Sequence, residues 1–327
     1  MDAFSTQPGS PLPERVELGK TGIQISPLGI GTWQWGDKFY WDYGKGGFSD
    51  NDLRAGFEVS LGAGINFFDS SETYGRGRSE TLLGQFVRAS GQQPVVATKF
   101  MPYPWRLKRA DLLKYLSESL GRLGMKSVDL YQIHWPTPPL PVEFWAEALA
   151  DAVEARLTRA VGVSNYSDAQ MWRTAAVLAR RGVHLASNQV RYNLLDRTVE
   201  KNSLLKACRD MGVSLIAYSP LAQGLLTGKY TPEHPLGGVR GLRDGRFVGP
   251  AQPLVAALGA IGEAHGGKSP AQVALNWVMR KNAVPIPGAK NLSQARENVG
   301  SLGWALSEDE VAALDEASDR AIHIDTL

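Results

Sequence analysis

The sequence contains one cysteine, Cys208, among its 327 residues. A single cysteine cannot form an internal disulfide bond, and a chain without disulfides is typical of the reducing cytoplasm, where we expect this protein to be located. The segment LLKACRDMG has the apolar period of a helix and places Cys208 on its apolar face. We therefore predict that Cys208 packs in the core and is not a nucleophile.

The chain also has no strong excess of charge and no long hydrophobic run. Its 35 lysines and arginines stand against 33 acids, and a net charge of +2 creates no field that would attract nucleic acid or an anionic membrane. No apolar run approaches the roughly 20 residues that cross a bilayer. Residues 1–14 lack the basic flank and apolar stretch of a secretory signal and are predicted to be a flexible tail. We expect small-molecule partners, no nucleic acid or membrane partner, and either a monomer or a homo-oligomer.

Three kinds of binding motif are missing as well. No G-x-G-x-x-G follows the first apolar run, so the Rossmann dinucleotide fingerprint is absent. The segment GLLTGKY lacks the spacing and the final Ser or Thr of a P-loop. No His or Cys spacing indicates a metal site, and we expect none.

What is present is a regular alternation of apolar runs and helical segments. Residues 15–26 have the pattern of a small β-hairpin. Eight apolar, β-branched runs follow, at residues 27–33, 65–70, 94–100, 128–135, 159–165, 185–190, 213–220 and 283–290. Helical segments follow them at residues 50–64, 78–90, 109–124, 142–157, 168–182, 200–212, 269–282 and 292–303. Ser49, Ser167 and Ser269 are expected N-caps, and Gly64, Gly124, Gly182 and Gly212 are expected to end helices.

This alternation predicts the fold. Strands that are apolar throughout are buried on both faces, and helices between them indicate parallel pairing. Eight repeats favour one closed (β/α)8 TIM barrel over residues 15–327, with an N-terminal β-hairpin. A doubly wound open sheet is the alternative, but no linker divides the chain into two halves. Residues 221–250, rich in Gly, Pro and Arg, are predicted to be a long and functional loop after the seventh strand.

Polar side chains stand where the predicted strands end. In a barrel of this type the carboxyl ends of the strands carry the active site, so these side chains are expected to share one rim. They are Thr32, Asp69 with Tyr74, Lys99, His134, Ser164 with Asn165, Gln189, and Tyr218 with Ser219.

Lys99 follows an apolar run and would lose its charge there unless it is paired, and Asp69 is the natural partner. A charged Lys99 beside a phenol favours the phenolate, so we predict that it lowers the pKa of Tyr74 towards the range of a general acid. His134 is predicted to be a neutral donor that orients a carbonyl oxygen beside Tyr74. Each of these residues alone has a common structural explanation, but three consecutive strand ends carry the four residues in order.

The sequence resembles the aldo-keto reductases from about residue 15 to about residue 320. The motifs that carry the resemblance are GTW (31–33), NFFDSSETYGRGRSE (66–80), ATKF (97–100), DLYQIHWP (129–136), GVSNY (162–166), SNQVRYN (187–193), AYSPLAQGLLTGKY (217–230) and IPGAKNLSQARENVG (286–300). The resemblance implies NADPH-dependent reduction of aldehydes or ketones to alcohols. It implies that Tyr74 is the proton donor, supported by Asp69, Lys99 and His134.

The resemblance also implies a cofactor site. Ser164, Asn165 and Gln189 would hold the nicotinamide carboxamide, and Tyr218 would stack on the ring. The residues along the pyrophosphate would be Ser219, Leu221, Gly224 and Leu225. Those around the adenosine ribose and its phosphate would be Lys290, Gln294, Glu297 and Asn298, of which Glu297 and Asn298 would reach the adenine amine. The other residues of the expected cofactor site are Gly31, Thr32, Trp33, Asp69, Pro220, Gln223, Lys229, Pro287, Gly288 and Ala289.

One departure from the family pattern concerns the phosphate of NADPH. Many members have PKS with an arginine six residues after the lysine, whereas this chain has Gly288, Ala289 and Lys290, with Gln294 at the arginine position. We expect Lys290 or Arg296 to supply a positive charge for a 2′-phosphate, although lysine lacks the bidentate fork of arginine. The PGAK form resembles a bacterial and plastid branch that includes pyridoxal-reducing enzymes.

Aromatic residues are expected to form the substrate pocket. Trp33, Trp105 and Trp135 lie within a few residues of strand ends and are the pocket candidates, which suits an apolar or aromatic aldehyde. Tyr40 and Trp41 are equally consistent with simple loop packing. A second class of function remains open, because potassium-channel β-subunits of this family keep the barrel, the nucleotide and the four catalytic residues while acting as regulatory proteins with slow turnover.

Overall fold

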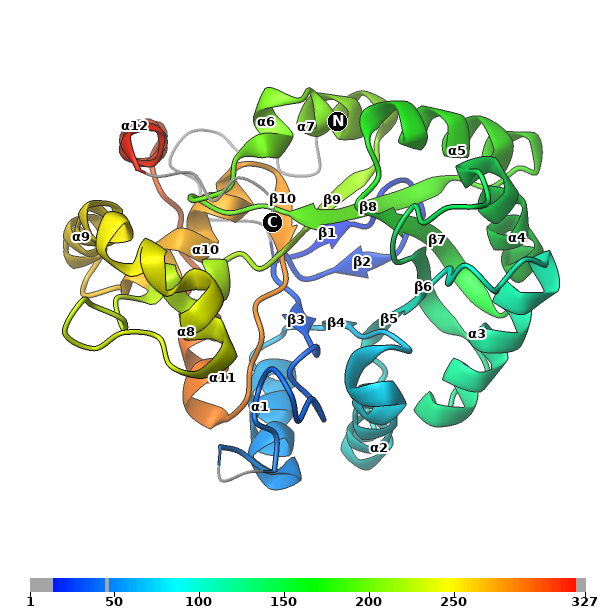
Figure 1. The fold of residues 1–327 in the computed structure, drawn as a ribbon, viewed down its shortest axis with the longest axis horizontal. Coiled ribbons are helices and arrows are strands. Elements are labelled where there is room, and N and C mark those ends of the chain that lie inside the picture. Colours follow the sequence, from blue (N-terminus) through cyan, green and yellow to red (C-terminus); the bar gives the residue numbers. More distant parts are fainter. Residues whose placement is uncertain (1–13, 45–46, 322–327) are drawn as a thin grey trace.

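The structure of the protein, a computed structural model, describes residues 14–44 and 47–321. The predicted tail at residues 1–14 lies outside these ranges except for its last residue. Eight parallel strands curl into a barrel, and helices surround it on the outside (Figure 1). The predicted TIM barrel is therefore confirmed.

The strands follow one another around the barrel in chain order. They are β3 (Ile30–Gly31), β4 (Phe67–Asp69), β5 (Val95–Phe100), β6 (Val128–Ile133), β7 (Thr158–Ser164), β8 (Leu185–Arg191), β9 (Ser214–Tyr218) and β10 (Ala283–Pro285). The first and last strands also meet, because the amides of Gly29 and Gly31 donate to the carbonyls of Pro285 and Pro287 at 2.9 and 3.0 Å. These bonds close the ring, so all eight carboxyl ends face the same rim.

The N-terminal hairpin closes the opposite end of the barrel. Strands β1 (Val16–Glu17) and β2 (Gln24–Ile25) pair antiparallel. Buried side chains of the hairpin, including Leu18 and Ile23, pack against inward-facing residues of the strands such as Phe67 and Leu130. The hairpin lies across the interior of the curled sheet in Figure 1. It seals the barrel floor with apolar contacts and leaves the other rim for chemistry.

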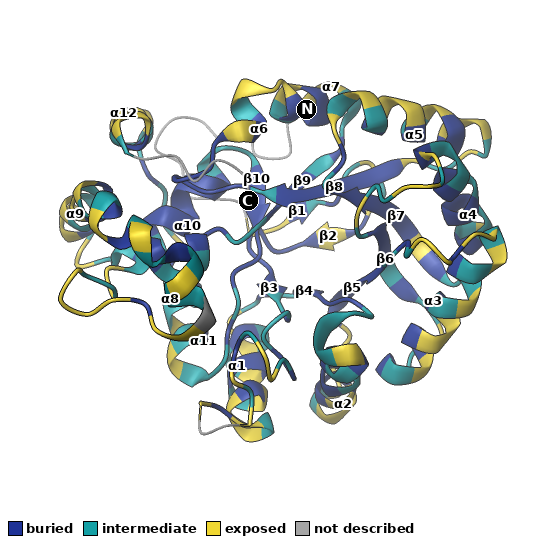
Figure 2. Cartoon of the chain, viewed as in Figure 1, coloured by how far each residue is buried: buried dark blue, intermediate teal, exposed yellow. Residues whose placement is uncertain are grey.

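The helices that were predicted from the sequence are present. They are α1 (Asp50–Gly62), α2 (Arg78–Ser90), α3 (Arg109–Leu123), α4 (Val142–Glu154), α5 (Asp168–Arg180), α6 (Thr198–Lys201), α7 (Leu204–Met211), α10 (Pro270–Arg280) and α11 (Leu292–Val299). Ser49, Ser167 and Ser269 cap their helices as predicted, and Gly124 and Gly212 end theirs in the left-handed conformation. Buried residues of these helices face the strands, and exposed residues face outward (Figure 2).

The segment after β9 is more helical than the sequence indicated. The predicted loop at residues 221–250 contains the 3-10 helices η2 (Ala222–Thr227) and η3 (Gly245–Phe247), the helix α8 (Gly238–Asp244), and the start of α9 (Val248–Ala264). Helix α9, and α12 (Glu308–Arg320) near the C-terminus, were not predicted. They contact each other, and α9 also contacts α10, so long-range packing supports α9, whose glycines and prolines obscure its helical pattern in the sequence.

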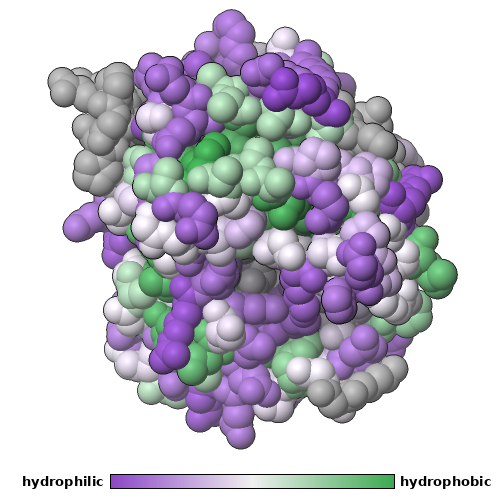
Figure 3. Space-filling model, turned by 90° about the vertical axis from the view of Figure 1, so that its left-hand side faces the viewer, coloured by the Kyte–Doolittle hydropathy of each residue, from purple (hydrophilic) through white to green (hydrophobic). Residues whose placement is uncertain are grey.

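The side of the molecule formed by these additional helices is mixed in character. Hydrophilic and hydrophobic residues are interspersed on it, and no single hydrophobic area covers the face (Figure 3). Among the helices within residues 14–44 and 47–321, none is long and apolar enough to cross a membrane.

Candidate active site

A cavity of about 740 Å³ opens at the carboxyl ends of the strands. Its inner part contains side chains that follow β4, β6, β7, β8 and β9, and its outer part runs between the segment after β9 and the start of α11. The expected residues that line it are Gly31, Trp33, Asp69, Tyr74, His134, Trp135, Ser164, Asn165, Gln189, Tyr218, Ser219, Pro220, Leu221, Gln223, Gly224, Lys229, Pro287, Gly288, Lys290, Gln294, Glu297 and Asn298.

A buried ion pair lies behind the inner wall. Lys99, at the end of β5, is fully buried and donates through Nζ to the Asp69 carboxylate at the end of β4. The same ammonium donates to the carbonyl of Ser70 at 2.8 Å and to the Tyr74 hydroxyl at 3.3 Å. The contact predicted between Lys99 and Asp69 is thus present, and it holds the ammonium beside the phenol.

The second carboxylate oxygen of Asp69 is also occupied. Oδ1 accepts from Nε2 of Gln132 at 3.0 Å and from Nε2 of Gln189 at 2.9 Å. A buried carboxylate with donors on both oxygens keeps its charge and its position. Gln132 was not recognised from the sequence, although a glutamine inside a buried strand, two residues before His134, is a signal that could have found it.

The pKa of Tyr74 departs from the prediction. Burial disfavours the phenolate and raises the pKa of Tyr74 above its ordinary value, while Lys99 lowers it and Asp69 raises it. The expectation of a net lowering is wrong. The reason is that desolvation by burial is the largest effect and outweighs the field of Lys99, which the charge of Asp69 also opposes. Tyr74 is therefore protonated at physiological pH.

His134 follows β6 and faces Tyr74 across the inner cavity. The two rings meet edge to face, with centroids 5.7 Å apart. Burial, and then the nearby Lys99 charge, lower the pKa of His134 to about 3. The imidazole is therefore neutral at physiological pH, in agreement with the prediction. Its Nδ1 lies 3.1 Å from Oγ of Ser71.

A chain of amide and hydroxyl groups extends the site along the next strands. Asn165 has a positive φ of 61° and donates to the carbonyl of His134 at 3.2 Å and to the hydroxyl of Ser164 at 3.0 Å. Tyr218 donates to Oδ1 of Asn165 at 3.0 Å. Burial raises the pKa of Tyr218 to about 12, so its ring stays neutral in the cavity wall. These bonds hold two flat groups, an amide and a phenol, side by side.

The backbone after β9 is held in an uncommon conformation. Ser219, Gln223 and Gly224 have φ values of 50°, 56° and 103°. Left-handed backbone at residues other than glycine costs of order 1 to 3 kcal/mol and clusters at ligand sites. At Gly224 a Cβ would also lie only 3.0 Å from the ring of Tyr230. The segment therefore brings backbone close to the cavity where a side chain would obstruct it.

The outer end of the cavity is cationic. Lys229, Arg240 and Lys290 line it, and none of them has an ion pair within the described ranges. Burial lowers the pKa of Lys290, and the charges of Arg240 and Lys229 lower it further. The opposite charge of Asp42 acts on Lys290 as well, but three neighbouring cations without an ion pair in the described ranges indicate a site for an anion. Sequence reasoning missed Arg240 because its helix, α8, was taken for part of a loop.

Other lining residues were also missed or left undecided. Trp41, for which loop packing was equally expected, does line the cavity, whereas Tyr40 only borders it, donating to Gln223 at 2.6 Å. The lining residues that were not expected are Gln34, Thr73, Arg191, Thr227, Tyr230, Arg240, Arg243, Ala271, Ile286 and Ser293. Four of them, Thr227, Tyr230, Arg240 and Arg243, come from the segment after β9, whose path the strand pattern does not reveal.

Besides Lys99, which lies buried behind the inner wall, four expected residues lie outside the cavity lining. Thr32, Leu225 and Ala289 are buried behind it. Trp105 was expected in the substrate pocket, but it is 69% exposed and stacks on Tyr103 with centroids 4.7 Å apart. The loop after β5 turns outward, so closeness to a strand end did not bring Trp105 to the rim centre.

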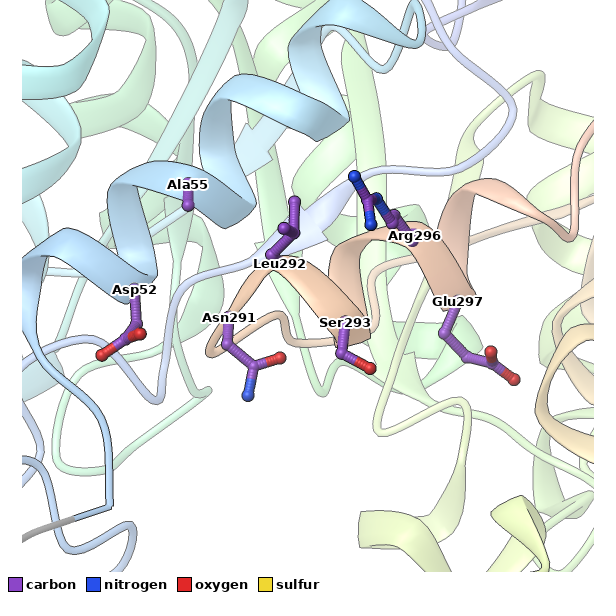
Figure 4. Close-up of a pocket in the computed structure, with 7 residues that line it drawn as sticks. All are labelled: Asp52, Ala55, Asn291, Leu292, Ser293, Arg296 and Glu297. Carbon is purple, nitrogen blue, oxygen red and sulfur yellow. The ribbon is translucent and has the colours of Figure 1, made fainter.

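A smaller pocket of about 530 Å³ lies beside the outer end of the cavity, between α1 and α11. Figure 4 shows Asp52 and Ala55 on α1 and five residues of the first turns of α11 around it. Arg296, an expected alternative to Lys290 for the 2′-phosphate, lines this pocket and not the main cavity. Ser293 and Glu297 line both, so the two spaces adjoin.

Two further expectations concern residues away from the cavity. Cys208 is buried, 4.0 Å from the sulfur of Met171, and burial raises its pKa to about 12, which makes it a poor nucleophile. Across the described part of the chain, no group of three or more His, Cys, Asp or Glu side chains is placed to hold a metal ion.

Comparison with known proteins agrees with this geometry. Residues 27–319 match the aldo/keto reductase family. The chain is 39% identical over 319 residues to the chloroplastic pyridoxal reductase of Arabidopsis thaliana, a match that covers 93% of this chain and 86% of that protein. Among solved structures it resembles a glycerol dehydrogenase of Gluconobacter oxydans, with a TM-score of 0.81, 27% identity and coverage of 96% and 97%. It also resembles an aldo/keto reductase of Klebsiella pneumoniae in complex with NADP and acetate, with a TM-score of 0.74, 27% identity and the same coverage. This chain belongs to the aldo/keto reductase family.

Proposed function

We propose that this protein is an NADPH-dependent carbonyl reductase in which Tyr74 protonates the substrate oxygen. The observation that carries the proposal is the position of the Lys99 ammonium, 3.3 Å from the Tyr74 hydroxyl and paired with Asp69. A charged donor on the phenol oxygen stabilises the phenolate that forms when Tyr74 gives up its proton. The high resting pKa of Tyr74 then keeps the proton in place until a carbonyl oxygen accepts it.

The other inner residues have supporting roles in this proposal. His134, neutral and edge-on to Tyr74, donates a hydrogen bond to the same carbonyl oxygen and polarises it. Asp69 keeps Lys99 charged, and Gln132 and Gln189 keep Asp69 in place. Together these groups supply the proton and stabilise the developing oxyanion. The hydride must come from elsewhere, because no protein side chain delivers one.

The cavity fits a nicotinamide dinucleotide in its shape and its donors. Its inner end holds the neutral ring of Tyr218 beside the amide of Asn165, which suits a flat ring with a carboxamide. Its outer end holds Lys229, Arg240 and Lys290, which suit phosphates. At Gly288 a Cβ would lie 2.5 Å from Oε1 of Gln34, so a side chain there would require Gln34 to move. When bound, the reduced nicotinamide supplies the hydride to the carbonyl carbon.

Three cations at the outer end favour the phosphorylated cofactor. A dinucleotide with a 2′-phosphate brings about two more negative charges than one without it, and Lys290, whose amide donates to Gln294, stands where the resemblance to the family implies that phosphate. The Klebsiella pneumoniae structure was solved with NADP, which agrees with this preference. We assign NADPH as the cofactor on these grounds.

The proposed substrate is an apolar or aromatic aldehyde or ketone. Trp33 and Trp135 line the cavity and offer flat apolar surface for such a substrate, whereas the ring of Trp41 lies at the outer end, 4.8 Å from Arg240 and 5.5 Å from Lys290. The similarity to a pyridoxal reductase makes pyridoxal, an aromatic aldehyde, the first compound to test. Trp105 has no part in this pocket.

The test is NADPH oxidation, followed by absorbance, with pyridoxal, benzaldehyde and an aliphatic aldehyde. Turnover with at least one of them is expected. Tyr74→Phe should lower kcat by a factor of about a thousand or more and leave the Kd of NADPH nearly unchanged, because the hydroxyl acts on the substrate oxygen. A loss of NADPH binding in Tyr74→Phe would contradict the assigned role. Tight NADPH binding without turnover for every carbonyl would instead favour a regulatory protein.

A further inference from the structure

Ser71 lies in the turn that leads from β4 to Tyr74. It is fully buried, two residues after Asp69 and three before Tyr74. Its hydroxyl oxygen is 3.1 Å from Nδ1 of His134, the ring that faces the same cavity from the end of β6. A side chain of the Tyr74 segment therefore contacts the ring nitrogen that points away from the reaction site.

The contacts of this hydroxyl restrict where its proton goes. The backbone amide of Thr73 donates to Oγ of Ser71 at 3.3 Å, which occupies one of its two lone pairs. Oγ1 of Thr73 lies 3.0 Å away and Nδ1 of His134 lies 3.1 Å away. One proton and one lone pair are left for these two partners. One of them must accept from Ser71, and the other must donate to it.

The second nitrogen of the ring decides between the two arrangements. His134 lines the cavity, and its Nε2 has no hydrogen-bond partner among the residues the structure describes. The imidazole is neutral, so only one of its nitrogens carries a proton. If Nδ1 carried it, Nε2 would present a lone pair to a carbonyl oxygen, which is repulsive. If Ser71 donates to Nδ1, Nε2 carries the proton and can donate.

We propose that Ser71 is a positioning residue that donates to Nδ1 of His134 and thereby holds the Nε2–H tautomer towards the substrate oxygen. In this arrangement the Thr73 hydroxyl donates to Ser71, so a chain of hydrogen bonds runs from Thr73, at the cavity lining, through the buried Ser71 to the imidazole. The inference rests on the proposed carbonyl reduction for its purpose. The tautomer itself is a property of the resting protein and can be measured without turnover.

The first measurement is the 15N spectrum of the histidine rings in the full-length protein, with His134 assigned by its absence in His134→Gln. In the wild type we expect the proton on Nε2 and an Nδ1 shift typical of an unprotonated nitrogen that accepts a hydrogen bond. In Ser71→Ala the Nδ1 shift should move to that of a nitrogen without a donor. A wild-type spectrum with the proton on Nδ1, or an Nδ1 shift unchanged in Ser71→Ala, would overturn the proposal.

The second measurement is kinetic. Ser71→Ala should lower kcat about tenfold, the effect of one orienting hydrogen bond, with the Kd of NADPH unchanged, and Ser71→Thr should recover most of the loss because it restores the hydroxyl. Ser79→Ala is the matched control, since it removes another buried hydroxyl near the site that has no contact with His134. An equal loss of kcat in Ser79→Ala would mean that Ser71 acts only through general packing.

The two proposals fail in different ways. If the wild type shows the Nε2–H tautomer and its dependence on Ser71 but reduces no carbonyl, the carbonyl reductase is wrong and the role of Ser71 in the tautomer stands. If the protein reduces carbonyls and Ser71→Ala changes neither the spectrum nor kcat, the role of Ser71 is wrong and the reductase stands.

Discussion

Replacing Lys99 with methionine tests the ion pair on which the proposed site depends. Lys99 is 0% exposed and Asp69 1%, so neither charge is solvated by bulk water. Methionine has a similar length and fills the space, but it leaves Oδ2 of Asp69 without a cation. Removing one partner of a buried pair costs about 3 to 5 kcal/mol. The amides of Gln132 and Gln189 still donate to Oδ1, which favours the lower part of that range.

The assay is urea unfolding followed by fluorescence and circular dichroism, and coincident transitions of the two probes establish two-state behaviour. The free energy of unfolding of Lys99→Met should fall by about 3 kcal/mol relative to the wild type. The control is the double variant Asp69→Asn with Lys99→Met, which contains no buried charge at this place. Its loss of unfolding free energy should be about 2 kcal/mol smaller than the sum of the losses in Asp69→Asn and Lys99→Met alone. A loss below about 1 kcal/mol in Lys99→Met would refute the reasoning, because the carboxylate would then not depend on the ammonium.

Three further predictions concern pH, cofactor choice and packing. The pKa of His134, about 3 in the folded protein, lies below the ordinary 6.5, so the unfolded chain binds a proton that the folded protein does not. The stability that this difference contributes is complete above pH 6.5 and is lost as the pH falls towards 3. In a plot of urea midpoint against pH, His134→Gln should therefore have a smaller slope between these values. An unchanged slope would contradict a depressed pKa of His134. Lys290→Ala should raise the Kd of NADPH about tenfold and leave that of NADH unchanged, as measured by fluorescence titration, whereas equal weakening of both would place Lys290 away from the 2′-phosphate. Gly84→Ala should destabilise the protein by about 1 to 3 kcal/mol, because its Cβ would lie 2.1 Å from the carbonyl oxygen of Leu123 on the neighbouring helix. Gly121→Ala, whose Cβ would face open space outside its own helix, should be neutral or slightly stabilising when both variants are compared by urea unfolding, and a similar loss in both would show that helix packing is not the cause.

Several site contacts could be anticipated from the chain because barrel topology converts order in sequence into position on a rim. Asp69, Lys99 and His134 end consecutive strands, and parallel strands place such ends at one edge. The pairing of Lys99 with Asp69 then followed from the cost of burying a lone ammonium. Tyr74, in the turn after β4, could be placed near them by the same reasoning.

The relations that the sequence missed depend on segments with no strand or helix period of their own. Arg240 reaches the cavity from α8, a short helix inside a glycine-rich stretch, and Trp105 turns away from it on the loop after β5. Gln132 and Ser71 each contact a catalytic candidate, but a glutamine in a strand and a serine in a turn have many ordinary explanations. Their partners are 63 residues away in the chain in both cases, and only folding brings them together.

The sequence by itself determined the barrel, its N-terminal hairpin and the rim that carries the polar residues, because periodicity, caps and apolar runs are local properties that each segment expresses wherever it lies. Tertiary structure alone decided the sign of the Tyr74 pKa shift and which hydroxyl contacts His134. Both depend on how much water is excluded and on which distant groups meet. A desolvated phenol beside a lysine that is paired with a carboxylate behaves differently from a phenol beside an unpaired charge.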